Sequence, residues 1–191
     1  MQRANHLLTQ LQTVLPTIAD NALLTEELRQ VPEENIELLK KAGLHKAFLP
    51  KTYGGCEVSL PEFGDCIAAL AGACPSTAWA FSLLCTHSHQ IALFPKQSQD
   101  DVWQKNPDAL ASSSIAPFGK YQETEGGVIF SGDMRWSSGC DHAEWALCGF
   151  LRTNTNGTKD HCFALIPSTD YAIKDDWHAA AVKGSGTKTL V

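Results

Sequence analysis

Residues 135–142 combine an aromatic side chain with small hydroxyl groups in a way that could bind a flat ligand. Arg135 and Trp136 begin a predicted short strand, and Ser137, Ser138 and a glycine follow. A strand that only had to pack would continue with Val, Ile or Phe. Hydroxyl and backbone N–H groups beside an aromatic face suit a heteroaromatic ligand with polar edges. The alternative is an ordinary strand end with a Ser-Ser-Gly turn.

A second segment, residues 77–90, places an indole and an imidazole on one side of a predicted helix. At about 100° per residue, Trp79, Leu83, Thr86 and His87 fall within one arc of roughly 100°. His89 points about 160° away from His87, so only one of these histidines can easily share a pocket with Trp79. Spacing alone does not decide which histidine this is, and a histidine near an apolar helix face is more often a core residue.

A third segment, Ser112-Ser113-Ser114, enters a predicted strand, where alternation can present hydroxyls to both faces. The alternative is a loop at the entry to a domain. Other chemistries have weaker support. Cys85, His87 and His89 are two residues apart, whereas a helical metal pair needs a spacing of three or four, so no metal is expected. Nucleophile-elbow, phosphate-loop and dinucleotide motifs are absent, and residues 184–188 form only a glycine-rich turn by these criteria.

Composition excludes several classes of partner. The 191 residues carry a net charge of −6 without a Lys/Arg run, so neither nucleic acid nor an anionic membrane is an expected partner. No apolar run approaches the roughly 18 residues needed to span a bilayer, and the N-terminus leads into an amphipathic pattern rather than a signal peptide. The seven cysteines are scattered without a C-x-x-C pair, which indicates a reduced, cytoplasmic protein.

Hydrophobic periodicity predicts that residues 1 to about 105 are all helical. Pro16 should end or kink the first helix, and Gly43 should follow the end of the third. Ser59 and Glu62 form a capping box that begins the next helix, and Ser98 should cap a short last one. The expected helices therefore cover residues 7–18, 22–30, 32–42, 60–74, 76–94 and 98–103.

After Asn106-Pro107-Asp108 the sequence becomes β-rich and punctuated by turns. The expected strands are 111–115, 127–131, 135–138, 145–152, 162–166, 171–173 and 188–191, and Asn156-Gly157 is a strong hairpin turn. We therefore predict an α+β chain with an N-terminal helical domain at 1–107 and a middle β-domain at 108–191. Because the last apolar strand stops without a turn or polar tail, we expect an incomplete β-domain and a fragment of a longer protein.

Taken together, these segments resemble one fold family. Residues 38–55, which include Gly-Leu-His-Lys-Ala-Phe-Leu-Pro-Lys-Thr-Tyr-Gly-Gly, are similar to the N-terminal signature of the acyl-CoA dehydrogenase fold. The resemblance covers nearly the whole chain and implies a helical domain, a β-barrel domain and a C-terminal four-helix bundle around a flavin. The bundle is absent from this chain.

Two departures from the dehydrogenases resemble the two-component flavin monooxygenases of this fold. The Thr-Glu-Pro motif at domain entry is replaced by residues 112–117, and the Trp-Ile-Thr/Ser-Asn motif by residues 136–142. The resemblance implies an oxygenase component, forming a homotetramer when full length. A separate reductase supplies it with reduced FMN, with FADH2 also possible. The enzyme then uses O₂ and a C4a-hydroperoxyflavin to hydroxylate a phenol, such as 4-hydroxyphenylacetate, at the ortho position.

The same resemblance assigns roles to individual residues. Trp136, Ser137, Ser138 and Ser113 would contact the flavin, with Ser138 near flavin N5. His87, Ser113 and Trp79 would hold the phenol, with His87 accepting its proton. Two alternatives remain: an acyl-CoA dehydrogenase-like flavin oxidoreductase, and a catalytically incompetent fragment of either enzyme.

Overall fold

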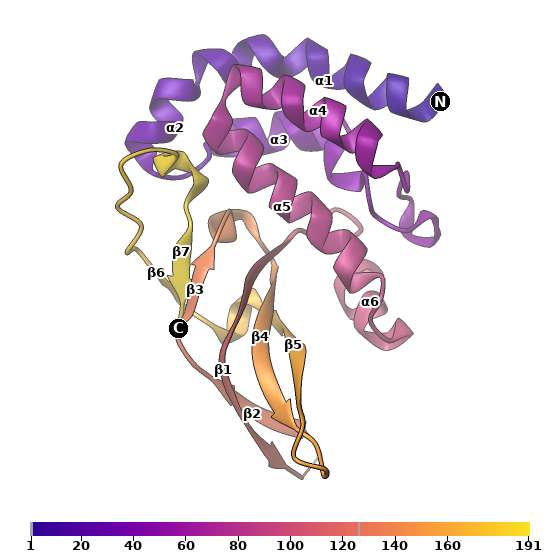
Figure 1. Ribbon diagram of the computed structural model, residues 1–191. Coiled ribbons are helices and arrows are strands. Elements are labelled where there is room, and N and C mark those ends of the chain that lie inside the picture. Colours follow the sequence, from indigo (N-terminus) through magenta and orange to yellow (C-terminus); the bar gives the residue numbers. More distant parts are fainter. Residues whose placement is uncertain (1, 126) are drawn as a thin grey trace.

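The helical part of the chain lies above two β-sheets (Figure 1). The computed structural model describes residues 2–125 and 127–191. Among these residues the elements bear out the predicted order of helices followed by strands. The helices are α1 (Gln2–Asp20), α2 (Ala22–Leu28), α3 (Glu33–Lys41), α4 (Leu60–Ala73), α5 (Pro75–Ile91) and α6 (Lys96–Trp103). None of the described helices is long and apolar enough to cross a membrane.

Local sequence signals explain several helix ends. The Ser59 hydroxyl accepts a hydrogen bond from the Glu62 amide, and the Glu62 side chain accepts one from the Ser59 amide, so the predicted capping box begins α4. Gly43 adopts φ 82° after α3, a conformation that costs glycine little. Two expectations were wrong. Helix α1 runs to Asp20, so the possibility that Pro16 ends it was wrong, and the alternative of a kink stays a prediction. The second wrong expectation is the cap at Ser98, because α6 begins at Lys96 and Ser98 lies inside it.

The main core joins the N-terminal helices. Helix α4 packs against α1 and α5, and their buried side chains meet those of α3. Leu11, Ile18, Leu39, Leu70 and Leu84 have no solvent exposure in this core. Their burial against several helices at once holds α5 rigidly, with one side facing the sheets.

The predicted β part forms two open sheets rather than a closed barrel within the described residues. The strands are β1 (Ala111–Thr124), β2 (Gly127–Ser131), β3 (Met134–Ser137), β4 (Trp145–Thr153), β5 (Lys159–Pro167), β6 (Ile173–Lys174) and β7 (Lys188–Leu190). The larger sheet has the order β2-β1-β4-β5, in which β1 and β4 are parallel. The smaller sheet, β3-β7-β6, is antiparallel.

Short 3-10 turns complete the framework. They are η1 (Leu44–Lys46), η2 (Lys51–Tyr53), η3 (Cys140–His142), η4 (Ser168–Asp170) and η5 (Lys183–Ser185). Turn η5 contacts both α2 and α5, so a segment late in the sequence lies beside the first helices (Figure 1). The helices end at Trp103 and the strands begin at Ala111. The division into domains at 1–107 and 108–191 remains a prediction.

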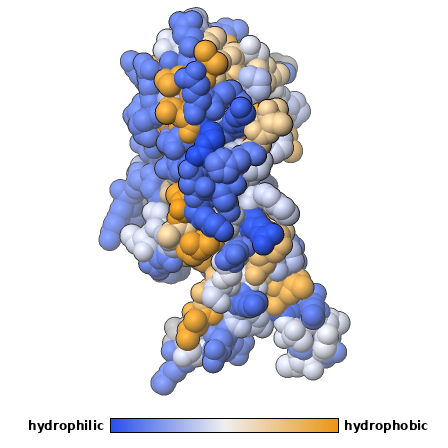
Figure 2. Space-filling view, turned by 90° about the vertical axis from the view of Figure 1, so that its left-hand side faces the viewer, coloured by the Kyte–Doolittle hydropathy of each residue, from blue (hydrophilic) through white to orange (hydrophobic). Residues whose placement is uncertain are grey.

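The space-filling view shows the side of the molecule on which the smaller sheet and α2 lie (Figure 2). Apolar side chains gather there in several separate patches among polar ones. Leu23, Leu24 and Leu28 of α2 are exposed, at 71%, 43% and 49% of their full areas. Exposed leucines are common on protein surfaces, so we assign these three no function.

Candidate active site

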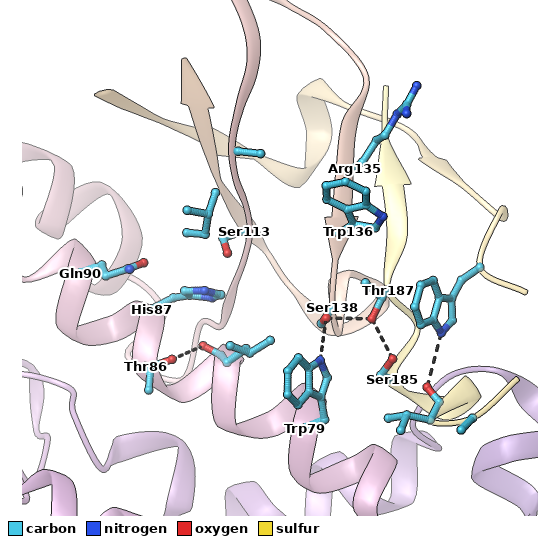
Figure 3. Close-up of a pocket in the computed structure, with 16 residues that line it drawn as sticks. Trp79, Thr86, His87, Gln90, Ser113, Arg135, Trp136, Ser138, Ser185 and Thr187 are labelled. Carbon is cyan, nitrogen blue, oxygen red and sulfur yellow. Dashed lines mark hydrogen bonds between the residues drawn. The ribbon is translucent and has the colours of Figure 1, made fainter. Parts of the chain in front are cut away.

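A cavity of about 660 Å³ lies where α5 faces β1, β3 and the segment from residue 177 to β7 (Figure 3). This volume is within the range of about 300–1,000 Å³ typical of small-molecule sites. Five of the six predicted site residues line it: Trp79, His87, Ser113, Trp136 and Ser138. They come from three separate elements and the turn after β3, so only the tertiary fold brings them together.

Helix α5 supplies one wall at the expected helical spacing. Trp79, Leu83, Thr86, His87 and Gln90 all line the cavity. In contrast, the exposed His89 points to the other side, where its ring centre lies 6.2 Å from that of Phe48. The geometry therefore selects His87 as the cavity histidine, a choice that spacing alone left open.

The protonation state of His87 follows from its one hydrogen bond. Its Nδ1 lies 2.7 Å from the carbonyl oxygen of Ala111, which can only accept, so Nδ1 carries the hydrogen. Burial lowers the pKa of His87 from 6.5 to about 4, and the bond to Ala111 only partly offsets this. At neutral pH the ring is uncharged, and Nε2 is left with a lone pair that can accept a hydrogen bond.

The three serines at the start of β1 divide between two faces, as strand alternation requires. The Ser114 hydroxyl donates to the Arg135 carbonyl over 2.7 Å, which ties β1 to β3. Ser112 accepts from Ser137 over 2.9 Å, and both side chains are completely buried. Ser113 faces the cavity instead, and its hydroxyl has no hydrogen-bond partner among the described residues.

Ser137 therefore lies outside the cavity wall, although the family resemblance placed it among the flavin contacts. Its hydroxyl is used inside the sheet by the bond to Ser112. The predicted backbone donors of this turn are also partly engaged, since the Gly139 amide donates to the Ser185 carbonyl over 2.9 Å. Gly139 itself has φ 71°, and a side chain there would come within 3.0 Å of Leu84.

Two tryptophans wall the cavity while remaining open to solvent. Trp79 is 55% exposed and Trp136 is 60% exposed, which is unusual for the largest apolar side chains. Trp136 also has φ 64°, a left-handed conformation that is costly for a bulky residue. The edge of its ring packs against Phe118 at 5.6 Å between centres. The strained backbone presents the indole to the cavity, where a flat ligand could cover it.

Sequence reasoning missed the wall made by the glycine-rich turn and its approach. Trp177, Ser185 and Thr187 also line the cavity. Thr187 lies 2.8 Å from Ser138 and 2.7 Å from Ser185, oxygen to oxygen, and the Trp79 N–H donates to Ser138 over 3.1 Å (Figure 3). The signal was present as two hydroxyl residues that alternate with glycines at 184–187, but no local pattern says that this turn contacts Ser138.

Electrostatically the site is nearly neutral. Arg135 is the one formally charged residue among the described cavity residues, because His87 is neutral. Its guanidinium lies 6.0 Å from the centre of the Phe118 ring. The arrangement offers aromatic faces, hydroxyls, a neutral imidazole and a single cation, which together suit a flat aromatic ligand that has polar edges and an anionic group.

Comparison with known proteins agrees with this description. Residues 11–106 match the family described as "Acyl-CoA dehydrogenase, N-terminal domain". The chain therefore belongs to the acyl-CoA dehydrogenase family.

Its relatives confirm the resemblance to two-component flavin monooxygenases. The chain is 62% identical over 184 residues to the "p-hydroxyphenylacetate 3-hydroxylase, oxygenase component" of Acinetobacter baumannii, covering 96% of this chain and 44% of that protein. It is 38% identical to the "FADH(2)-dependent resorcinol hydroxylase, oxygenase component" of Rhizobium sp. strain MTP-10005, covering 90% of this chain and 42% of that protein. The chain thus spans about half the length of the curated relatives it matches.

A solved structure supports the fold and the relationship. The crystal structure of 3-HSA hydroxylase from Rhodococcus sp. RHA1 superposes with a TM-score of 0.93 at 36% identity, covering 97% of this chain and 48% of that one. This agreement extends over the helices and both sheets.

Proposed function

We propose that this chain carries flavin-binding and phenol-binding residues of the oxygenase component of a two-component aromatic monooxygenase. The substrate would be a phenol such as 4-hydroxyphenylacetate, hydroxylated ortho to its hydroxyl group. The observation that carries the proposal is a single cavity in which exposed indoles, a buried serine hydroxyl and a neutral histidine face one another. The names of the relatives support the same reaction class.

The cavity residues fit a flavin ring. The indole faces of Trp79 and Trp136 can stack on or flank a flat heteroaromatic system, and Ser138 lies between them at a polar edge (Figure 3). Arg135 can pair with an anionic group of the flavin or of the substrate. A reduced flavin held by these residues would activate O₂, and one oxygen atom of that O₂ would be transferred to the phenol. A flavin covering the exposed indoles of Trp79 and Trp136 would limit water around that chemistry.

His87 would act on the phenol as a hydrogen-bond acceptor. Its Nε2 lone pair can accept a hydrogen bond from the phenol hydroxyl. This bond shifts electron density into the ring and makes the ortho carbon more nucleophilic. Complete proton transfer is uphill at first, because an ordinary phenol has a pKa of about 10 and His87 has a pKa of about 4. The proton therefore moves to His87 only as the ring is attacked. Ser113 can make a second bond to the phenol oxygen.

The partners and the cofactor form follow from the same proposal. A separate reductase supplies reduced FMN, although FADH2 is also a candidate cofactor, and O₂ is the second substrate. The protein assembles as a homotetramer and works in the cytoplasm. The names of the relatives support flavin dependence and the two-component organisation, and one of them uses FADH(2).

Replacing His87 by Ala should separate flavin consumption from product formation. With reduced FMN, O₂ and 4-hydroxyphenylacetate, flavin oxidation should continue, but the yield of hydroxylated phenol per flavin should fall about tenfold, because the phenol loses one buried hydrogen bond. Hydrogen peroxide should rise correspondingly. The measurement is product and peroxide per flavin oxidised.

His89→Ala is the matched control, since His89 lies on the same helix outside the cavity. Its yield should stay near that of the unsubstituted protein. If His89→Ala lowers the yield and His87→Ala does not, the phenol does not meet His87.

A further inference from the structure

The three hydroxyls of Ser138, Thr187 and Ser185 form a continuous hydrogen-bonded row beside the cavity (Figure 3). All three side chains are buried, with 4%, 8% and 1% exposure. The backbone holds the row in place: the Gly139 amide donates to the Ser185 carbonyl over 2.9 Å. The Glu26 carboxylate also accepts the amides of Lys183 and Gly184, so the turn is fixed against α2.

The direction of the row follows from counting hydrogens. Ser138 already accepts the Trp79 N–H, which leaves it one hydrogen and one further lone pair. Thr187 is the hydrogen-bond partner of the Ser185 side chain within the described chain, and Ser185 is 1% exposed. If Ser185 did not donate to Thr187, its hydrogen would have no acceptor among the described residues, which is unfavourable for a side chain with 1% exposure.

Donation therefore runs from Ser185 to Thr187 and from Thr187 to Ser138. Ser138 then accepts two hydrogen bonds, from Trp79 and Thr187, and its own hydrogen has no internal acceptor left. That hydrogen points into the cavity. In the opposite direction Ser138 would donate its hydrogen to Thr187, which would leave none for the cavity, and the Ser185 hydrogen would lose its acceptor.

We infer that Thr187 and Ser185 are positioning residues that fix the Ser138 hydroxyl as a hydrogen-bond donor toward an acceptor atom of the flavin. The inference rests on the proposed function, because it assigns the acceptor to flavin N5. It gives a role to the glycine-rich turn, since Gly184 packs so closely on α2 that an added side chain would come within 2.3 Å of Thr25.

The test compares binding of oxidised FMN with that of 5-deaza-FMN, in which a C–H group replaces the N5 acceptor. Calorimetric titration of the unsubstituted chain should show FMN binding about two- to tenfold more tightly, the contribution of one hydrogen bond. Thr187→Val keeps the shape of the side chain but removes its hydroxyl, and it should make the affinities for FMN and 5-deaza-FMN equal. Thr187→Ser should restore the preference, and Ser138→Ala should abolish it.

Thr189→Val is the matched control, because it makes the same chemical change on β7 outside the cavity. It should keep the preference for FMN. If Thr187→Val also keeps it while Ser138→Ala loses it, Ser138 is oriented without the row and the inference fails. If the unsubstituted chain binds FMN and 5-deaza-FMN equally tightly, the inference is overturned but the proposed function, which needs only flavin binding, still stands. If neither flavin binds, the proposed function fails together with it.

Discussion

Replacing Asp141 by Ala is expected to lower the free energy of unfolding by about 3–5 kcal/mol, the usual effect of removing one partner of a buried ion pair. Asp141 Oδ1 lies 2.7 Å from Lys188 Nζ, and the two side chains are only 14% and 9% exposed. Without Asp141 the ammonium group would remain buried. Asp175 lies 4.0 Å away and is 56% exposed, so it cannot replace the lost partner.

The ion pair also matters for the site, because Asp141 follows Ser138 by three residues and Lys188 follows Thr187 directly. Urea denaturation measures the effect. Asp160→Ala is the control, since its pair with Arg152 is about half exposed on both sides and should contribute less than about 1 kcal/mol. Replacing both buried partners, as in Asp141→Leu with Lys188→Met, should recover much of the stability. If Asp141→Ala and Asp160→Ala both lower the free energy of unfolding by the same small amount, the Asp141–Lys188 pair is not buried in solution.

Acid should destabilise the protein through His87 by about 3 kcal/mol, the free energy of the pKa difference between 6.5 and about 4. Above pH 6.5 the imidazole is neutral in both the folded and unfolded chains, so it adds no pH dependence. As pH falls through 6.5 the unfolded chain takes up a proton, whereas the folded chain does so only near pH 4. Protonation therefore favours unfolding across this window.

The measurement is the free energy of unfolding against pH for the unsubstituted chain and for His87→Gln, which cannot titrate. The two curves should run parallel above pH 6.5 and converge or cross as pH falls toward 4, with a relative change of about 3 kcal/mol. His45 has a pKa that is likewise lowered by burial, but it is present in both proteins and cancels in the difference. Parallel curves down to pH 4 would mean that His87 is not buried as a neutral group.

Sequence patterns predicted those features that depend on neighbouring residues. The capping box of Ser59 and Glu62 and the strand at 127–131 appear where turn chemistry and alternation placed them. Helical spacing correctly grouped Trp79 and His87 on one side of α5, because a long buried helix keeps its period.

The remaining features depend on contacts between distant segments. Pro16 lies in the interior of a helix that packing extends to Asp20, and Ser137 turns inward because Ser112 meets it across the sheets. The glycine-rich turn enters the site only because η5 packs on α2 and α5. A single sequence contains no local signal for such contacts between distant segments.

Anaerobic titration of the chain with reduced FMN tests the central claim, that this cavity binds reduced flavin, most directly. The matched variant is Leu83→Trp, which fills the cavity from α5 without removing a hydrogen bond that the site uses. Tryptophan fluorescence is the readout, and we expect the unsubstituted chain to bind one flavin saturably. In Leu83→Trp we expect flavin binding to be lost while the helical circular dichroism stays unchanged. Binding that survives when the cavity is filled, or a folded chain that binds no reduced flavin, would contradict the account.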